Sequence, residues 1–368
     1  MKHFNGLPPE LQDKKPTGKM WRCFGGERTQ GDLVKIDEGQ KGRAMDFEIL
    51  KKRLEGCYVT VPTMFRDPEL ELDLEATRSH VRFLMERGIN ADNAVLLAGG
   101  AAGDFSTMTF DERAAVVKAI IAEAAGQVPV AMGAQTTSTL ELRRLIQCAQ
   151  ELGADFVQIS PPFYFEHTED DFFEFVQAAA EAAPEVGIII YNTFWTSGNV
   201  STDLVDRLAE IPSVVGLKWA TPRSDSMEFE TVCSRFSDRF TIIDNNLLFT
   251  LSFMLGARAI EMHPCNYWPE FGITMLEDLR AGRYEKVQQA MIEAVMPFYH
   301  LWVKIESEYT SGDGYLDKLC MELVGLPSSR CRPPTRDIRE RYRNETIEMM
   351  KQSGVPGLIV STEYNSIE

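Results

Sequence analysis

The stretch PSVVGLKWAT, residues 212–221, decides how the rest of the chain is interpreted. It has the composition of a buried parallel strand, because an apolar run follows a proline and ends at a Thr-Pro turn. The period-2 alternation of a strand predicts that Val214, Gly216 and Lys218 share one face, with Val215 on the opposite face. Lys218 therefore shares its face with small groups that leave it room.

A lysine is unusual at the end of such a run. Burial removes the water that stabilises an ammonium ion, so Lys218 can be a neutral amine near pH 7. A neutral amine attacks a carbonyl carbon and forms a Schiff base. From this stretch alone the alternative stays open that Lys218 is ion-paired, or that its amine reaches solvent at the strand end.

The composition excludes several classes of protein. A net charge of −17 argues against a nucleic-acid partner and leaves no polybasic membrane patch. No apolar run is long enough to span a bilayer, and the first residues lack the apolar core of a signal peptide. The seven cysteines are scattered without metal-ligand spacing. We therefore expect a cytoplasmic protein with reduced thiols and no metal site.

Strand-like and helical patterns alternate from residue 56 onward. The predicted strands are 57–62, 93–98, 128–132, 155–160, 187–191, 213–218, 240–244 and 258–263. The predicted helices between them are 73–88, 110–125, 137–152, 169–183, 201–209, 225–236 and 246–255. This rhythm predicts an α/β fold, a (β/α)8 TIM barrel. The alternative, a doubly wound sheet, would more often show a Gly-rich phosphate loop after its first strand.

Three regions are predicted. Residues 1–55 form an N-terminal extension, residues 56–282 the barrel, and residues 283–368 a C-terminal helical region and tail. Helical patterns in the last region cover 283–309, 314–325 and 335–351. In the extension, the obvious anchors are Trp21, Cys23 and Phe24.

In this fold the carboxyl ends of the barrel strands carry the chemistry, so functional residues are expected directly after each strand. After the second strand, glycines at 99, 100 and 103 can turn backbone amides inward to bind an anion. The alternative is a plain loop. After the fourth strand, the aromatic run that contains Tyr164 can roof a cavity or form a subunit contact.

Two further strand ends carry groups that can transfer protons. Tyr191 ends the strand before the lysine strand, and its hydroxyl can reach the imine carbon. A core tyrosine bonded to backbone is the alternative. Glu261 and His263 close the eighth strand and can act as acid and base, or can be exposed loop residues.

Together these motifs resemble the dihydrodipicolinate synthase / N-acetylneuraminate lyase superfamily of class I aldolases. The resemblance runs from Gly56 to Pro334 and depends on the order and spacing of several loose motifs. These motifs are GAAGD at 100–104, TMT at 107–109, PFY at 162–164, YN at 191–192, GLK at 216–218, AT at 220–221, GA at 256–257, Asn266 and RPP at 332–334. The resemblance implies that Lys218 is the Schiff-base lysine and Tyr191 the proton-relaying tyrosine. It also implies that Tyr164 is the second tyrosine, often lent across a subunit interface.

The chain departs from the family at two places. Ala101 and Ala102 occupy the positions of two hydroxyl residues that help to bind the keto-acid carboxylate and extend the proton relay. Phe194 and Thr196 occupy the positions of a proline and of an arginine, and in the lysine-synthesis branch this arginine receives a second carboxylate. With Trp195, Trp219, Met262 and Trp268 near strand ends, these changes predict a less polar co-substrate.

We therefore expect a Schiff-base-forming lyase, of the aldolase or hydratase-aldolase type. Its substrates are expected to be a 2-oxo acid such as pyruvate and a bulky aldehyde or alkylidene partner, for example an aromatic one, without a metal or organic cofactor. The expected substrate-binding residues are Gly100, Ala101, Ala102, Gly103, Thr196, Phe194, Trp195, Ile260, Met262 and His263. The alternatives are an ordinary dihydrodipicolinate synthase-like enzyme and a non-catalytic metabolite-binding barrel. The resemblance implies a homo-oligomer, a dimer or tetramer.

Overall fold

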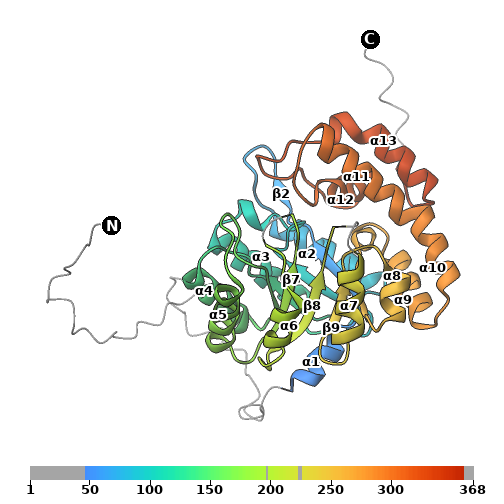
Figure 1. Ribbon diagram of the computed structural model, residues 1–368. Helices are drawn as coiled ribbons and strands as arrows, with labels where there is room; N and C mark the ends of the chain where they lie inside the picture. Colours follow the sequence, from blue (N-terminus) through green and yellow to red (C-terminus); the bar gives the residue numbers. More distant parts are fainter. Residues whose placement is uncertain (1–45, 196–197, 223–225, 360–368) are drawn as a thin grey trace, which may run out of the picture. The chain divides into compact units, whose positions relative to one another are not determined.

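The computed structural model describes residues 46–195, 198–222 and 226–359 (Figure 1). The anchors expected in the extension, Trp21, Cys23 and Phe24, lie outside these residues. Within them, no helix is long and apolar enough to cross a membrane.

Eight parallel strands close into a barrel in the order β1-β10-β9-β8-β7-β6-β5-β4. They are β1 (Gly56–Val61), β4 (Ala94–Ala98), β5 (Val130–Gly133), β6 (Phe156–Ile159), β7 (Gly187–Asn192), β8 (Val214–Trp219), β9 (Thr241–Asp244) and β10 (Ala259–Glu261). Every residue of these strands is buried, as expected for parallel strands covered by helices. The predicted (β/α)8 barrel is confirmed, and each strand overlaps a predicted one.

Helices surround the barrel and bury their apolar stripes against the strands. They are α2 (Leu74–Glu86), α3 (Phe110–Ala124), α4 (Thr139–Leu152), α5 (Glu169–Ala182), α6 (Thr202–Leu208), α7 (Ser226–Phe236), α8 (Phe249–Met254) and α9 (Pro269–Arg280). Two features were not predicted from the sequence: helix α9 and a short hairpin formed by β2 (Phe65–Arg66) and β3 (Glu71–Leu72). Between strands and helices lies the outer core, the largest cluster of buried apolar side chains.

The amino end of the barrel is closed by α1 (Phe47–Arg53), which the sequence analysis also missed. Leu50 and Leu54 belong to the same interior cluster as inward-facing strand residues. A Cβ atom at Gly216 would lie 2.3 Å from Leu54 Cδ2, so a larger residue there would displace the Leu54 side chain. Figure 1 shows α1 at the opposite end of the barrel from α11 to α13. A catalytic site is therefore expected at the other end of the barrel, where the strands have their carboxyl ends.

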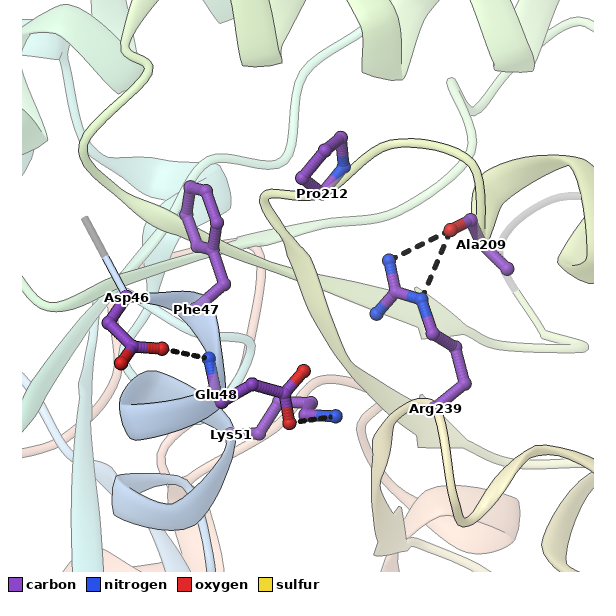
Figure 2. A pocket seen from close by; sticks show the side chains of 7 residues that line it. All are labelled: Asp46, Phe47, Glu48, Lys51, Ala209, Pro212 and Arg239. Atoms are coloured by element: carbon purple, nitrogen blue, oxygen red, sulfur yellow. Dashed lines mark hydrogen bonds and ion pairs between the residues drawn. The ribbon is translucent and has the colours of Figure 1, made fainter. Parts of the chain in front are cut away.

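A pocket at this closed end is lined by side chains that stabilise the fold (Figure 2). Its lining residues are Asp46, Phe47, Glu48, Lys51, Ala209, Pro212 and Arg239. The guanidinium of Arg239 donates to the carbonyl oxygens of Ala209, Ile211 and Val214, so its donors stabilise the turn before β8.

The predicted alternation in β8 is wrong at one step. Val214 packs in the outer core whereas Val215 belongs to the interior cluster. The pairing with β7 shifts register here, because Ile188 pairs with Val214 and Ile189 pairs with Gly216. Val215 is thus the extra residue of a β-bulge, and alternation resumes after it.

The C-terminal helical extension is confirmed. It consists of α10 (Tyr284–Ala290), a π-helical turn η5 (Met291–Val295), α11 (Met296–Glu308), α12 (Tyr315–Leu323) and α13 (Arg339–Gln352). Helices α11 to α13 share a second apolar core with Met64 and Tyr267, which follow β1 and β10. Residues of α12 consequently reach the carboxyl end of the barrel.

Candidate active site

Lys218 lies at the carboxyl end of β8 with its side chain directed into the barrel. Only 4% of the residue is exposed, and its Nζ atom lies 2.5 Å from Glu261 Oε2. The same Nζ lies 4.5 Å from the ring centre of Tyr191 and 5.2 Å from that of Tyr58. Lys218 is therefore ion-paired, which is one of the alternatives that the sequence left open. The other alternative, an amine that reaches solvent, is wrong because the residue is buried.

Glu261 ends β10 and faces the lysine across the barrel mouth. Its Oε1 atom accepts a hydrogen bond from Thr60 Oγ1 at 3.1 Å and lies 3.9 Å from His263 Nε2. Its Oε2 atom is the one that forms the ion pair with Lys218. Glu261 and His263 are both buried, so the alternative of exposed loop residues is wrong.

His263, in the 3-10 turn η4 (His263–Asn266), is held by Asp317 of α12. The Nδ1 atom of His263 lies 3.0 Å from both carboxylate oxygens of Asp317, which also accepts from Asn266 Nδ2. Burial by itself lowers the pKa of His263, but Asp317, Asp313 and Glu261 outweigh it and raise the pKa to about 9. His263 is therefore a buried cation at neutral pH.

Tyr191 is the cross-strand neighbour of Lys218 in the register of β7 and β8. Its hydroxyl oxygen accepts a hydrogen bond from Asn245 Nδ2 at 3.2 Å, so it is not the backbone-bonded core tyrosine of the alternative. Burial, and then the charge of Glu261, raise the pKa of Tyr191, so the phenol keeps its proton at neutral pH. Tyr58 also points at the lysine, and its hydroxyl has no hydrogen-bond partner among the described residues.

The Gly-rich loop after β4 uses part of its backbone internally. The amides of Gly103 and Asp104 donate to the carbonyl oxygens of Gly100 and Ala101. The amides of Ala101 and Ala102 donate to no other described residue. A buried ion pair between Asp104 and Lys318 of α12, at 2.7 Å, ties the loop to the C-terminal helices.

The aromatic residues predicted at the strand ends have different fates. Phe194 and Trp195 form an edge contact, with ring centres 4.9 Å apart, and Trp195 also meets Tyr191 edge-on at 6.3 Å. Thr196 lies outside the described residues. Tyr164 is 86% exposed and has a positive φ of 88°, an unusual conformation for a bulky residue.

Other predicted residues are not brought to Lys218. Ile260 and Met262 pack in the outer core, because they alternate with the inward-facing Glu261. Trp219 lies in the same layer, and its Nε1 donates to Glu228 of α7. Trp268 packs against Phe271, with ring centres 4.7 Å apart. Of these predicted aromatic residues, Phe194 and Trp195 therefore remain as support for a less polar co-substrate.

Several site residues were not predicted from the sequence. Asp317 and Asn245 act through partners more than fifty residues away in sequence, so no local pattern indicates them. Gln135 and Gln158 have buried carboxamides without partners among the described residues. Gln158 is a polar residue inside the apolar run of β6, and this local signal could have indicated a site residue.

The chain matches one family model and many known proteins. The model of the dihydrodipicolinate synthetase family matches residues 53–353. The chain is 27% identical over 304 residues to the 4-hydroxy-tetrahydrodipicolinate synthase of Syntrophus aciditrophicus, covering 82% of this chain and 99% of that protein. It is 28% identical over 283 residues to the enzyme of the same name from Methanosphaerula palustris, covering 76% and 92%.

Solved structures show the same fold. Dihydrodipicolinate synthase from Oceanobacillus iheyensis superposes with a TM-score of 0.74 at 24% identity, covering 84% of this chain and 99% of that one. The chloride-inhibited dihydrodipicolinate synthase of Acinetobacter baumannii, complexed with pyruvate, superposes with a TM-score of 0.72 at 24% identity, covering 82% and 99%.

Proposed function

Because this chain belongs to the dihydrodipicolinate synthetase family, we propose that it is a Schiff-base-forming lyase that acts on a 2-oxo acid such as pyruvate. The observation that carries the proposal is the buried amine of Lys218 at the carboxyl end of a barrel strand, beside Tyr191 and Glu261. A relative of known structure was solved in complex with pyruvate, which supports this class of substrate.

In this mechanism Glu261 takes one proton from the Lys218 ammonium ion. The neutral amine attacks the carbonyl carbon of the acid, and the C–N bond forms as the C=O electron pair moves to oxygen. Glu261 returns its proton to that oxygen, removes the next proton from nitrogen, and delivers it as the hydroxyl leaves as water. An ammonium ion and a ketone become an iminium ion and one water, and Glu261 ends as a carboxylate.

The iminium ion then withdraws electrons from the neighbouring carbon atom. A C–C bond is made or broken there, or water is added or removed. Tyr191 is proposed to relay protons in this step, since its neutral phenol lies against the lysine and is oriented by Asn245. The amides of Ala101 and Ala102 are proposed to face the anionic end of the substrate.

The second substrate is proposed to be a bulky aldehyde or alkylidene acid, for example an aromatic one. Its support is the aromatic pair of Phe194 and Trp195 beside Tyr191, both partly exposed and so open to a ligand. The competing candidate is an ordinary dihydrodipicolinate synthase-like reaction with aspartate semialdehyde, which the names of the relatives favour. A barrel without activity is the third reading, and the Lys218–Glu261 pair argues against it.

Tyr164 is proposed to act across a subunit interface in a homo-oligomer. An exposed aromatic ring held on a strained backbone needs a stabilising partner, and a second copy of the chain can supply it.

Borohydride trapping tests the proposal directly. Incubation with pyruvate and sodium borohydride should add the mass of the reduced acid to Lys218, as seen by peptide mass spectrometry. The variant Lys218→Met should show no addition. Labelling at another lysine, such as the buried Lys318, or none with any 2-oxo acid tried, would exclude the Schiff-base mechanism.

A further inference from the structure

Two glutamine side chains point into the barrel from neighbouring strand ends. Gln158 lies between Val157 and Ile159, which both pack in the outer core, so alternation directs Gln158 inward. Gln135 follows Ala134, another outer-core residue, beyond the end of β5. The two carboxamides therefore belong to the inner wall of the barrel and not to its helical shell.

These carboxamides are buried and unpaired. Gln158 is fully buried and Gln135 is 4% exposed. In both, the nitrogen and the oxygen atom lack a hydrogen-bond partner among the described residues. Buried polar groups nearly always have partners, because an unpaired one destabilises the folded state. The two Nε2 donors left unpaired on the inner wall indicate a ligand that supplies acceptor oxygens.

The pair lies between the Gly-rich loop and the catalytic strands. A Cβ atom at Gly133 would lie 2.0 Å from Gly99 O and 2.7 Å from Gln135 Oε1, so the Gln135 carboxamide is beside the start of the loop. Gln158 pairs with Gly133 on one side and with Ile189, in the strand of the candidate tyrosine, on the other.

A buried cation lies behind this wall. The guanidinium of Arg113, on α3, donates to the carbonyl oxygens of Gly133 and Gln135. Within the part of the chain that the structure describes, its Nε atom has no hydrogen-bond partner, and the charge of the Glu141 carboxylate acts on it. Burial lowers the pKa of Arg113 to about 10, so it stays charged at neutral pH. Its field favours an anion in front of Gln135.

We propose that the carboxamides of Gln135 and Gln158 form a subsite that, together with the backbone amides of Ala101 and Ala102, binds the carboxylate of the 2-oxo acid. This inference rests on the proposed function, since it assigns the part of the substrate that Lys218 does not bond. Both Nε2 groups donate to the carboxylate oxygens, and Arg113 contributes charge from behind. The subsite replaces the two hydroxyl groups that Ala101 and Ala102 cannot supply.

The test compares two ketones on variants of the full chain. Gln135→Met and Gln158→Met keep the side-chain length and remove the polar atoms, and Gln150→Met is the matched control. Gln150 lies on α4, where its carboxamide accepts from the amide of Glu185. Half-saturating concentrations for borohydride trapping at Lys218 are measured with pyruvate and with acetone, which lacks the carboxylate. Thermal unfolding is followed in the same samples.

For Gln135→Met and Gln158→Met, the half-saturating pyruvate concentration should rise about tenfold to hundredfold while that of acetone stays constant. The midpoint of thermal unfolding should stay or rise, because an unpaired buried polar group has been removed. An unchanged ratio of pyruvate to acetone overturns the subsite, as does equal weakening of both ketones with lower stability, the mark of a structural role. Wild-type protein that traps neither ketone instead overturns the proposed function.

Discussion

Replacing Asp317 with asparagine is expected to turn His263 from a buried cation into a neutral side chain. The chain contains its own comparison, because His80 is another buried histidine, and its Nε2 atom lies 3.1 Å from the side-chain amide oxygen of Asn266. Burial lowers the pKa of His80 to about 4, whereas the pKa of His263, beside a carboxylate, is raised to about 9. Asp317→Asn gives His263 the kind of partner that His80 has.

The size and sign of the effect on stability follow from these values. In the wild-type protein the folded state binds the His263 proton more tightly than the unfolded chain, in which a histidine has a pKa of about 6.5. The stabilisation is fully present below pH ~6.5 and is lost as the pH rises through about 9. The difference between these two pKa values corresponds to about 3 kcal/mol of unfolding free energy, at roughly 1.4 kcal/mol per pH unit.

Histidine NMR and urea unfolding at several pH values measure both quantities. The His263 resonance, assigned with His263→Asn, should titrate near pH 9 in the wild type and below its ordinary value in Asp317→Asn. The free energy of unfolding should fall between pH ~6.5 and ~9 by about 3 kcal/mol more in the wild type than in the variant. A variant in which His263 still titrates near pH 9 would refute the assignment of the raised pKa to Asp317.

Two predictions concern catalysis. Tyr191→Phe should lower kcat by roughly 10²–10⁴-fold, since it removes the relaying hydroxyl and keeps the ring. The circular dichroism spectrum should stay unchanged. A kcat close to that of the wild type would show that Tyr191 only packs against its neighbours. Benzaldehyde-type acceptors should have a higher kcat/KM than aspartate semialdehyde, because Phe194 and Trp195 bury an aromatic ring but give a carboxylate no partner. A tenfold preference for the semialdehyde would show that the polarity argument is wrong.

Much of the barrel could be predicted because its signal is local. Parallel strands covered on both faces read as short apolar runs between turn residues, and the helices between them carry an apolar stripe. The elements that were missed have weaker local signals. The helix α1 is a single short amphipathic stretch, and α9 follows a turn that breaks the apolar pattern.

The sequence by itself determined the barrel, the position of Lys218 at a strand end and the resemblance that pointed to Tyr191. Only the tertiary structure decided which groups meet there. Closing the barrel brings Glu261, from the last strand, to 2.5 Å from the amine, and α12 then supplies Asp317 to the histidine. Strand order, inward direction and the docking of a distant helix are properties of the whole packed chain. No local pattern of residue types encodes them, because the contacts form between segments whose separation in sequence is arbitrary.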